Sequence, residues 1–474
     1  MAEAVICPVR SLLSDFLGLS GAPNELNVRC ILYRTAYRHV AGIVRYVNKN
    51  GFHWNSSGGP MRTSWLIALC IPIALQGPAF AQQLEAYTPL EKERWLQGDQ
   101  PLQLKLYGGL SYDSNLFRLS DDADTQATIG SSEKSDMIYQ LGAGAQYEFR
   151  KSRQKFIAQA NFTEYRFQRF DNLNNTSNAL LGEWQWQVGD DWNGELGFGH
   201  RRYLESFADF QQNVRDMVNQ DRIYGAANYL VYSRLKLTLA ADWNDTDHGE
   251  ASRDSLDSKI NNTTATVNWI TPAENTIGAQ FRNAKARYPN SAIVGTSLVQ
   301  NDYTENEYSL VTYWRLTGAS EIRARLGHTD RSFEQAPNRD YSSPTWRLNY
   351  IWRPTGKTAV DFSTWRELSD FQNLSANYVR ITGISVIPTW SLAPKLALRG
   401  KISYEKLDYL GDPGLTAPAA QREDKDKIYQ VSLLWTPWRL TELDFNLETG
   451  RRTSNQALAD FQYNAISFLA TRYF

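Results

Sequence analysis

Apolar and polar residues alternate along much of the chain beyond about residue 100. In the segment from Leu235 to Trp243, every second residue is apolar, and Lys, Thr, Ala and Asp stand between. The segments 396–404 and 443–447 repeat this alternation. Successive side chains of a β-strand point to opposite faces of its sheet. The pattern therefore predicts strands with one apolar and one polar face.

Short turn signals recur at intervals of about forty residues, and three of them place a tryptophan just before a proline. These are Trp269 before Pro272, Trp352 before Pro354, and Trp435 before Pro437. Proline cannot donate to the hydrogen-bond ladder, so we expect each to end its strand. Tryptophan is enriched at membrane interfaces. A further turn is expected at 389–394, and longer polar loops at 115–135, 207–219, 248–258, 289–302 and 410–426.

These strands and turns predict an all-β fold, a transmembrane antiparallel up-and-down β-barrel over residues 102–474. The count is about 18 strands, with 16 as the alternative. An even number of strands brings both ends of the chain to the periplasmic side, where turns are short. A propeller would need about four short strands per repeat and an apolar interior. A plugged receptor would need a large domain before the barrel, where only residues 82–101 are expected.

The segment around residue 70 has the layout of a secretory signal peptide. A basic start at Met61 precedes the apolar run 65–75, and Ala79-Phe80-Ala81 supplies a cleavage site before Gln82. We therefore assign 61–81 as the signal peptide and 82–101 as a short periplasmic segment. Residues 1–60 are interpreted as a spurious or disordered extension, with a genuine leader as the alternative. Export and a barrel together predict the bacterial outer membrane.

Composition excludes several kinds of site. The cysteines are Cys7, Cys30 and Cys70, all before the expected cleavage point, so neither disulfides nor cysteine-bound metals are expected. The chain has 50 Lys+Arg and 51 Asp+Glu, which does not favour a nucleic-acid partner. The mean hydropathy is negative. This agrees with a barrel, in which only alternate residues face lipid.

No motif for a cofactor or metal is present. The histidines beyond the signal peptide are His200, His248 and His328, and they lack metal-ligand spacing. His328 and Ser332 share one strand face near a barrel rim, which keeps a barrel enzyme open as an alternative. A single histidine at a rim more often belongs to the membrane interface, so we predict no enzymatic activity.

Within a strand, residues of one parity (every second residue) share a face. Charged residues whose parity is that of the polar face are candidates for lining the lumen. Arg or Lys facing lipid near the midplane costs about 2–4 kcal/mol, whereas a hydrated lumen accepts charge. The candidates are Arg323, Arg325, Arg347, Asp361, Trp365, Arg399, Lys401, Asp444 and Glu448, with Glu183 on the same parity. They either cross-link a solvated wall or form a polar track for a hydroxyl-rich or anionic glycan. Trp365 either stacks on sugar rings or packs against the wall.

The octapeptide Tyr112-Asp113-Ser114-Asn115-Leu116-Phe117-Arg118-Leu119 resembles the opening of a known barrel family. It is similar to the EpsL-type outer-membrane proteins of exosortase-associated exopolysaccharide operons. The resemblance implies a role in moving extracellular polysaccharide across the outer membrane, and it carries no catalytic residues. One departure lies near the end of the chain, where Arg472 occupies a usually apolar position.

Three functions follow as hypotheses. The first is a pore for export of extracellular polysaccharide, the alternative is a general diffusion porin for small solutes, and the least favoured is a barrel enzyme. The expected partners are membrane lipid, a polysaccharide, the outer-membrane barrel assembly machinery and periplasmic export proteins.

Overall fold

The computed structural model describes residues 101–474, apart from 209, 295–296, 371–375, 377 and 412–420. The expected extension, the signal peptide and all but the last residue of the expected periplasmic segment lie outside these residues.

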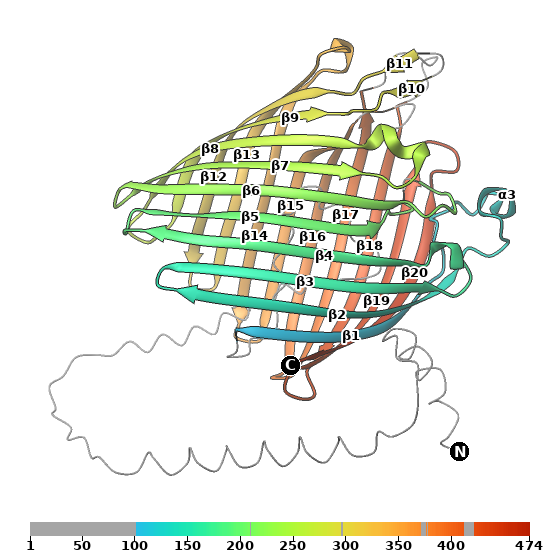
Figure 1. The fold of residues 1–474 in the computed structure, drawn as a ribbon, viewed down its shortest axis with the longest axis horizontal. Coiled ribbons are helices and arrows are strands. Elements are labelled where there is room, and N and C mark those ends of the chain that lie inside the picture. The colour runs from blue at the N-terminus through green and yellow to red at the C-terminus, as the bar shows by residue number, and fades with distance from the viewer. Residues whose placement is uncertain (1–100, 209, 295–296, 371–375, 377, 412–420) are drawn as a thin grey trace, which may run out of the picture. The chain divides into compact units, whose positions relative to one another are not determined.

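The described chain forms an 18-stranded antiparallel sheet that closes on itself, so the predicted fold class and strand count are confirmed (Figure 1). Each strand pairs with the next along the chain, and β9 pairs with β12 because β10 and β11 form a separate hairpin. The strands are β1 Leu102–Asp113, β2 Asp136–Lys151, β3 Gln154–Phe167, β4 Asn175–Val188, β5 Trp192–Leu204, β6 Met217–Tyr232, β7 Leu235–Asp247, β8 Ser258–Ile270, β9 Thr276–Arg287, β10 Ala292–Val294, β11 Ser297–Val299, β12 Tyr303–Thr317, β13 Ser320–Phe333, β14 Tyr341–Thr355, β15 Thr358–Asp370, β16 Tyr378–Ala393, β17 Leu396–Leu410, β18 Glu423–Trp435, β19 Thr441–Ser454 and β20 Phe461–Tyr473.

The barrel closes between its first and last strands. β1 and β20 pair from Lys105 opposite Tyr473 to Asp113 opposite Ala465. Phe474 extends this contact, since its backbone N–H donates to the Leu104 carbonyl at 2.8 Å. Closure leaves no strand of the main sheet with an unpaired edge.

The helices are short and lie in the connections. They are α3 Thr125–Ile129, η1 Asp171–Leu173, η2 Ala251–Leu256 and η3 Pro337–Arg339. None of the described helices has the length and apolar character needed to cross a membrane.

The two faces of the wall differ as the alternation predicts. Large apolar side chains are exposed on the outer face, among them Leu239 at 64% and Leu310 at 60%. Their neighbours on the inner face are polar, and Glu307 and Ser309 beside Leu310 are buried. With no free edge and an apolar exterior, the strands of the main sheet can span lipid without exposing backbone polar groups.

Short turns and longer loops alternate around the barrel, as expected for periplasmic and extracellular ends respectively. Two expected turns are wrong in detail. Pro354 lies inside β14, at a register shift between Trp352 and Thr355, because a bulge removes the need for its missing N–H. Thr389 pairs with Arg399 inside the β16–β17 ladder, so that turn begins only after Ala393.

Loop boundaries also differ from expectation. The loop expected at 207–219 spans 205–216, because Met217 and Val218 already pair with β5. The loop expected at 289–302 contains the β10–β11 hairpin, which the sequence pattern did not predict. Arg472, the unusual residue near the C-terminus, donates to the Arg439 carbonyl in a short turn at 2.7 Å. It therefore lies at the periplasmic rim, where a charge costs little.

Candidate pore interior

Five charged residues form a continuous chain of ion pairs on the inner wall, here called the charge ladder. They are Arg282 of β9, Glu307 of β12, Arg325 of β13, Arg347 of β14 and Glu367 of β15. Glu307 lies 3.1 Å from Arg282 and 2.9 Å from Arg325. Glu367 pairs with both Arg325 and Arg347. The signs alternate along the chain of contacts, so each carboxylate sits between two guanidinium groups.

Two further residues extend this chemistry toward the loops. Arg331 lies 2.7 Å from Glu305, and both side chains are almost fully buried. Glu305 also pairs with Arg282. The Arg331 guanidinium lies 3.9 Å from the centre of the Tyr303 ring. Buried charges require such partners, because an unpaired charge taken out of water is strongly unfavourable.

All nine candidate lining residues lie on the same parity as the charge ladder, which contains Arg325 and Arg347. Arg323 is 64% exposed and lies 3.6 Å from Glu321. The Glu448 carboxylate accepts a hydrogen bond from the Tyr463 hydroxyl at 2.7 Å. The structure thus gives these residues partners in the wall, and their role in transport stays a prediction.

The remaining charged candidates lie nearer the short turns. Arg399 is within electrostatic range of Asp361 and Asp444, although the three residues lie on strands that are not direct neighbours. Lys401, on the same strand as Arg399, is within electrostatic range of Glu405. The basic residues expected to form a track are therefore accompanied by carboxylates.

Trp365 packs on the wall. It lies directly opposite Gly383, and a Cβ on that glycine would come within 2.4 Å of the Trp365 ring. An aromatic ring covering a cross-strand glycine is a device that fixes register in sheets. The same arrangement recurs on the inner face where Tyr224 covers Gly197. Packing of Trp365 is thus established, and stacking on sugars stays a prediction.

The octapeptide that carries the family resemblance folds into a tightly bonded turn at the loop end of β1. Arg118 and Asp113 form an ion pair at 2.9 Å, with side-chain exposures of 3% and 1%. The Asn115 backbone N–H donates to the Asp113 carboxylate at 2.8 Å. The Arg118 guanidinium lies 3.5 Å from the centre of the Tyr463 ring on β20. The octapeptide is evident in the sequence, whereas this ion pair is not.

The loops 114–135 and 205–216 pack together over a buried apolar cluster, here called the mouth cluster. Its members are Leu116, Phe117, Leu119, Ile129, Ile138, Phe167, Phe170, Leu173, Leu204, Phe207 and Met217. The rings of Phe117 and Phe207 lie 4.7 Å apart, centre to centre. Burial raises the pKa of Glu205, at the start of the second loop, and Arg253 partly opposes that shift.

The loop 205–216 reaches across this end of the barrel. The Arg452 side chain of β19 donates to the Ala208 carbonyl at 3.3 Å, although β19 and β5 are not neighbouring strands. Arg452 is held by Asp426 at 2.8 Å. Gln211 of the loop also donates to the Arg118 carbonyl. These contacts hold the loop across part of the opening.

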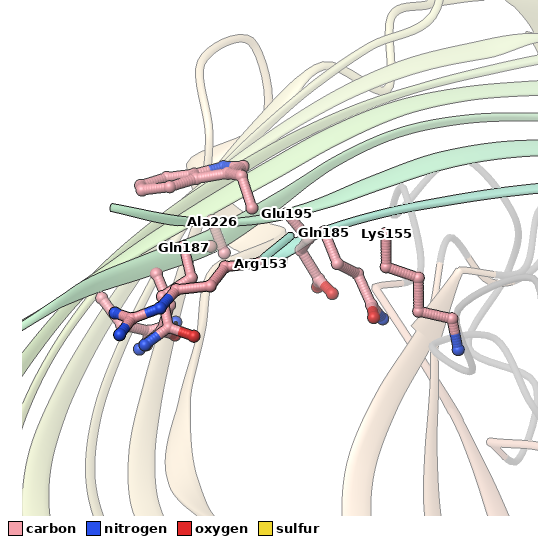
Figure 2. A pocket seen from close by; sticks show the side chains of 10 residues that line it. Arg153, Lys155, Gln185, Gln187, Glu195 and Ala226 are labelled. Carbon is pink, nitrogen blue, oxygen red and sulfur yellow. Dashed lines mark hydrogen bonds between the residues drawn. The ribbon is translucent and has the colours of Figure 1, made fainter. Parts of the chain in front are cut away.

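A polar hollow of about 530 Å³ lies on the inner wall near the short turns of β3 to β6. Its lining includes Gln185, Gln187, Asn193 and Asn228, with Glu195 beside them. The labelled side chains of Gln185, Gln187 and Glu195 project from one side of the sheet (Figure 2). Amides both donate and accept hydrogen bonds, so this lining suits hydroxyl-rich solutes.

The expected pair of His328 and Ser332 makes no contact. The Ser332 hydroxyl is directed to the Thr304 carbonyl. His328 Nε2 instead lies 2.9 Å from the Ser342 hydroxyl and 3.3 Å from Asp330. Both contacts involve the same ring nitrogen, whereas in a catalytic triad the nucleophile and the carboxylate bind opposite nitrogens of the histidine. Within the described residues, no group of three or more His, Cys, Asp or Glu is placed to hold a metal ion.

Comparison with solved structures finds similar proteins at low sequence identity. The outer membrane protein OpdK from Pseudomonas aeruginosa is 12% identical, with a TM-score of 0.45, over 79% of this chain and 99% of that one. OccK2 (OpdF) from Pseudomonas aeruginosa, in complex with glucuronate, is 11% identical, with a TM-score of 0.45, over 79% and 98%. The siderophore receptor PirA from Pseudomonas aeruginosa is 10% identical, with a TM-score of 0.40, over 80% and 81%. No family model and no curated protein matches the chain.

The protein is a β-barrel of the bacterial outer membrane. The closed sheet, the apolar outer face and the polar interior carry this conclusion, and they confirm the predicted localisation.

Proposed function

We propose that the barrel is a pore through which small hydrophilic solutes diffuse. The observation that carries the proposal is the loop 205–216, which Arg452 and Gln211 hold across part of the opening of a polar, charged interior. A partly covered opening favours small solutes over a polymer chain. This ranks the diffusion porin above polysaccharide export.

The interior chemistry supports the same proposal. The charges of the ladder are paired with one another, so these five residues bind a passing solute more weakly than unpaired charges would. Conduction needs binding that is weak enough for release.

The test is permeation by size. Purified protein is reconstituted into liposomes, and swelling is measured with neutral sugars from a monosaccharide to a long oligosaccharide. We expect entry of the small sugars and exclusion of the longest. Equal entry of all sizes would contradict the proposed size limit, and no entry by any sugar would contradict a diffusion pore.

A matched pair of variants tests whether the mouth cluster restricts permeation. Phe207→Ala removes a buried ring of the mouth cluster, and we expect it to raise single-channel conductance by loosening the loop. Phe445→Ala makes the same change at an exposed position of the outer face and should leave conductance unchanged. Equal conductance in both variants would show that the loop 205–216 does not restrict the pore.

Polysaccharide export remains a second candidate, supported by the amide-rich hollow near the short turns. The resemblance to the EpsL-type family motivates it as well. Deleting the gene and measuring secreted against periplasmic polysaccharide tests it. Polysaccharide retained in the periplasm, and released again on complementation, would favour export over general diffusion.

A further inference from the structure

Two cations oppose one another directly on the outer face of the barrel, at its loop end. Lys427 of β18 pairs in register with Arg451 of β19, and both side chains are exposed. Like charges directly opposite one another destabilise a sheet. We call these two residues the rim pair.

Depth along the strand places the rim pair at the edge of the apolar band. The outer face of β18 continues from Lys427 to Tyr429, Val431, Leu433 and Trp435, and Trp435 ends the strand beside a short turn. The distance from Lys427 to Trp435 is about 26 Å along the strand, which at a tilt of about 40° is about 20 Å of height. An outer-membrane barrel has an apolar band about 25 Å tall with aromatic residues at both borders. Lys427 follows Tyr429, the aromatic residue nearest the loop end on this face, so it lies at the extracellular border of the band, where its long side chain can reach the lipid headgroups.

Nearby outward cations have partners within the protein. Lys406 lies 2.8 Å from Glu423, and Lys425 lies 3.2 Å from the same carboxylate. In the described part of the chain, no carboxylate comes within ion-pair distance of Lys427 or Arg451. Asp121, which contacts Gln462 opposite Arg451, is itself paired with Lys134 at 3.1 Å. The rim pair thus lacks a counter-charge at the depth of lipid headgroups.

We propose that the rim pair binds the phosphate of a lipid headgroup in the outer leaflet. An anionic oxygen group between the two side chains would offset their repulsion and accept charge-assisted hydrogen bonds from both. The outer position of the pair and the apolar surface beside it, at Val431 and Leu447, suit a lipid whose acyl chains lie along the wall. The site is separate from the pore interior and does not depend on the proposed function.

The test uses protein in zwitterionic nanodiscs, titrated with diphosphorylated lipid A or with the same lipid lacking its phosphates. Native mass spectrometry reports bound lipid. We expect a preference for the phosphorylated lipid that Lys427→Gln with Arg451→Gln weakens by roughly 25-fold, about five-fold for each cation removed. Binding should also fall as salt rises.

Three comparisons make the result decisive. Lys357→Gln with Arg439→Gln removes two exposed cations from short turns at the other end and should bind like the wild type. Lys427→Arg with Arg451→Lys keeps both charges and should also retain binding. Heat-modifiable migration confirms that each variant is folded. Equal binding of both lipids, or equal loss in the turn variant, would overturn the proposal, as would complete displacement by inorganic phosphate.

Discussion

At the residue scale, the turn after β1 rests on one buried ion pair. Asp113 accepts from both the Arg118 guanidinium and the Asn115 backbone, while Arg118 adopts a left-handed backbone with φ of 55° and lies over Tyr463. Three neighbouring apolar residues, Leu116, Phe117 and Leu119, then enter the mouth cluster. The pair therefore connects the wall to the loop 114–135, against which the loop 205–216 packs.

Asp113→Asn should open this loop while the barrel stays folded. Removing one charge of a buried pair leaves the other unpaired and costs about 3–5 kcal/mol. Hydrogen exchange across residues 114–135 measures the opening. The control is Asp121→Asn, the same substitution in an exposed pair with Lys134, where a loss of about 1 kcal/mol or less is expected. Equal exchange in the two variants would contradict the role of the Asp113 pair.

At the element scale, the cost of a charge on a strand depends on its depth. Leu310 lies in the middle of β12 with 60% exposure, whereas Leu237 lies close to the start of β7, beside the turn at 233–234. Both face outward. The two positions therefore compare the membrane midplane with the periplasmic border on the same face.

Leu310→Arg should destabilise the barrel folded in lipid by about 2–4 kcal/mol, and Leu237→Arg by about 1 kcal/mol or less. Denaturant titration in lipid vesicles measures both. Lys236→Leu, on the inner parity beside Leu237, should have little effect. Similar losses at Leu310 and Leu237 would show that the strands sit in the bilayer at a different depth.

At the scale of the whole molecule, charges of both signs line the interior, and the ladder spreads across five strands on one side of the barrel. Its two carboxylates, Glu307 and Glu367, offset two of the three guanidinium charges. The electrostatic potential inside the pore therefore depends on keeping these carboxylates ionised and in place.

Glu307→Gln with Glu367→Gln should shift ion selectivity several-fold toward anions, because Arg325 and Arg347 lose their carboxylate partners and Arg282 keeps only Glu305. Reversal potentials in planar bilayers across a salt gradient report this shift. Asp190→Asn with Glu274→Gln removes the same charge from short turns, where the side chains are 86% and 76% exposed, and serves as control. A folded ladder variant with wild-type selectivity would show that ions pass elsewhere.

The sequence predicts the barrel well because alternation is a local property of each strand. From residues 235–243 alone, parity separates the outward Leu239 from the inward Lys236. The contacts within the interior are not local. Arg325 meets Glu367 from 42 residues away, and Arg452 meets Ala208 from 244 residues away. Strand pairing on both sides of β14 brings Arg325 to Glu367, and the curvature of the closed sheet brings Arg452 to Ala208. Parity therefore predicts which residues face inward but not which ones pair.

Closure has a consequence for the order in which the strands are joined. Phe474 donates its N–H to the Leu104 carbonyl, so the first and last strands lie side by side like any other neighbours. Every strand of the main sheet has a partner on each side, and in space none is first or last. A short linker from the C-terminal residue to Leu102, with new ends opened at a short turn such as 233–234, would preserve every pairing of the main sheet except for the opened turn. Such a circular permutant requires no rearrangement of the wall.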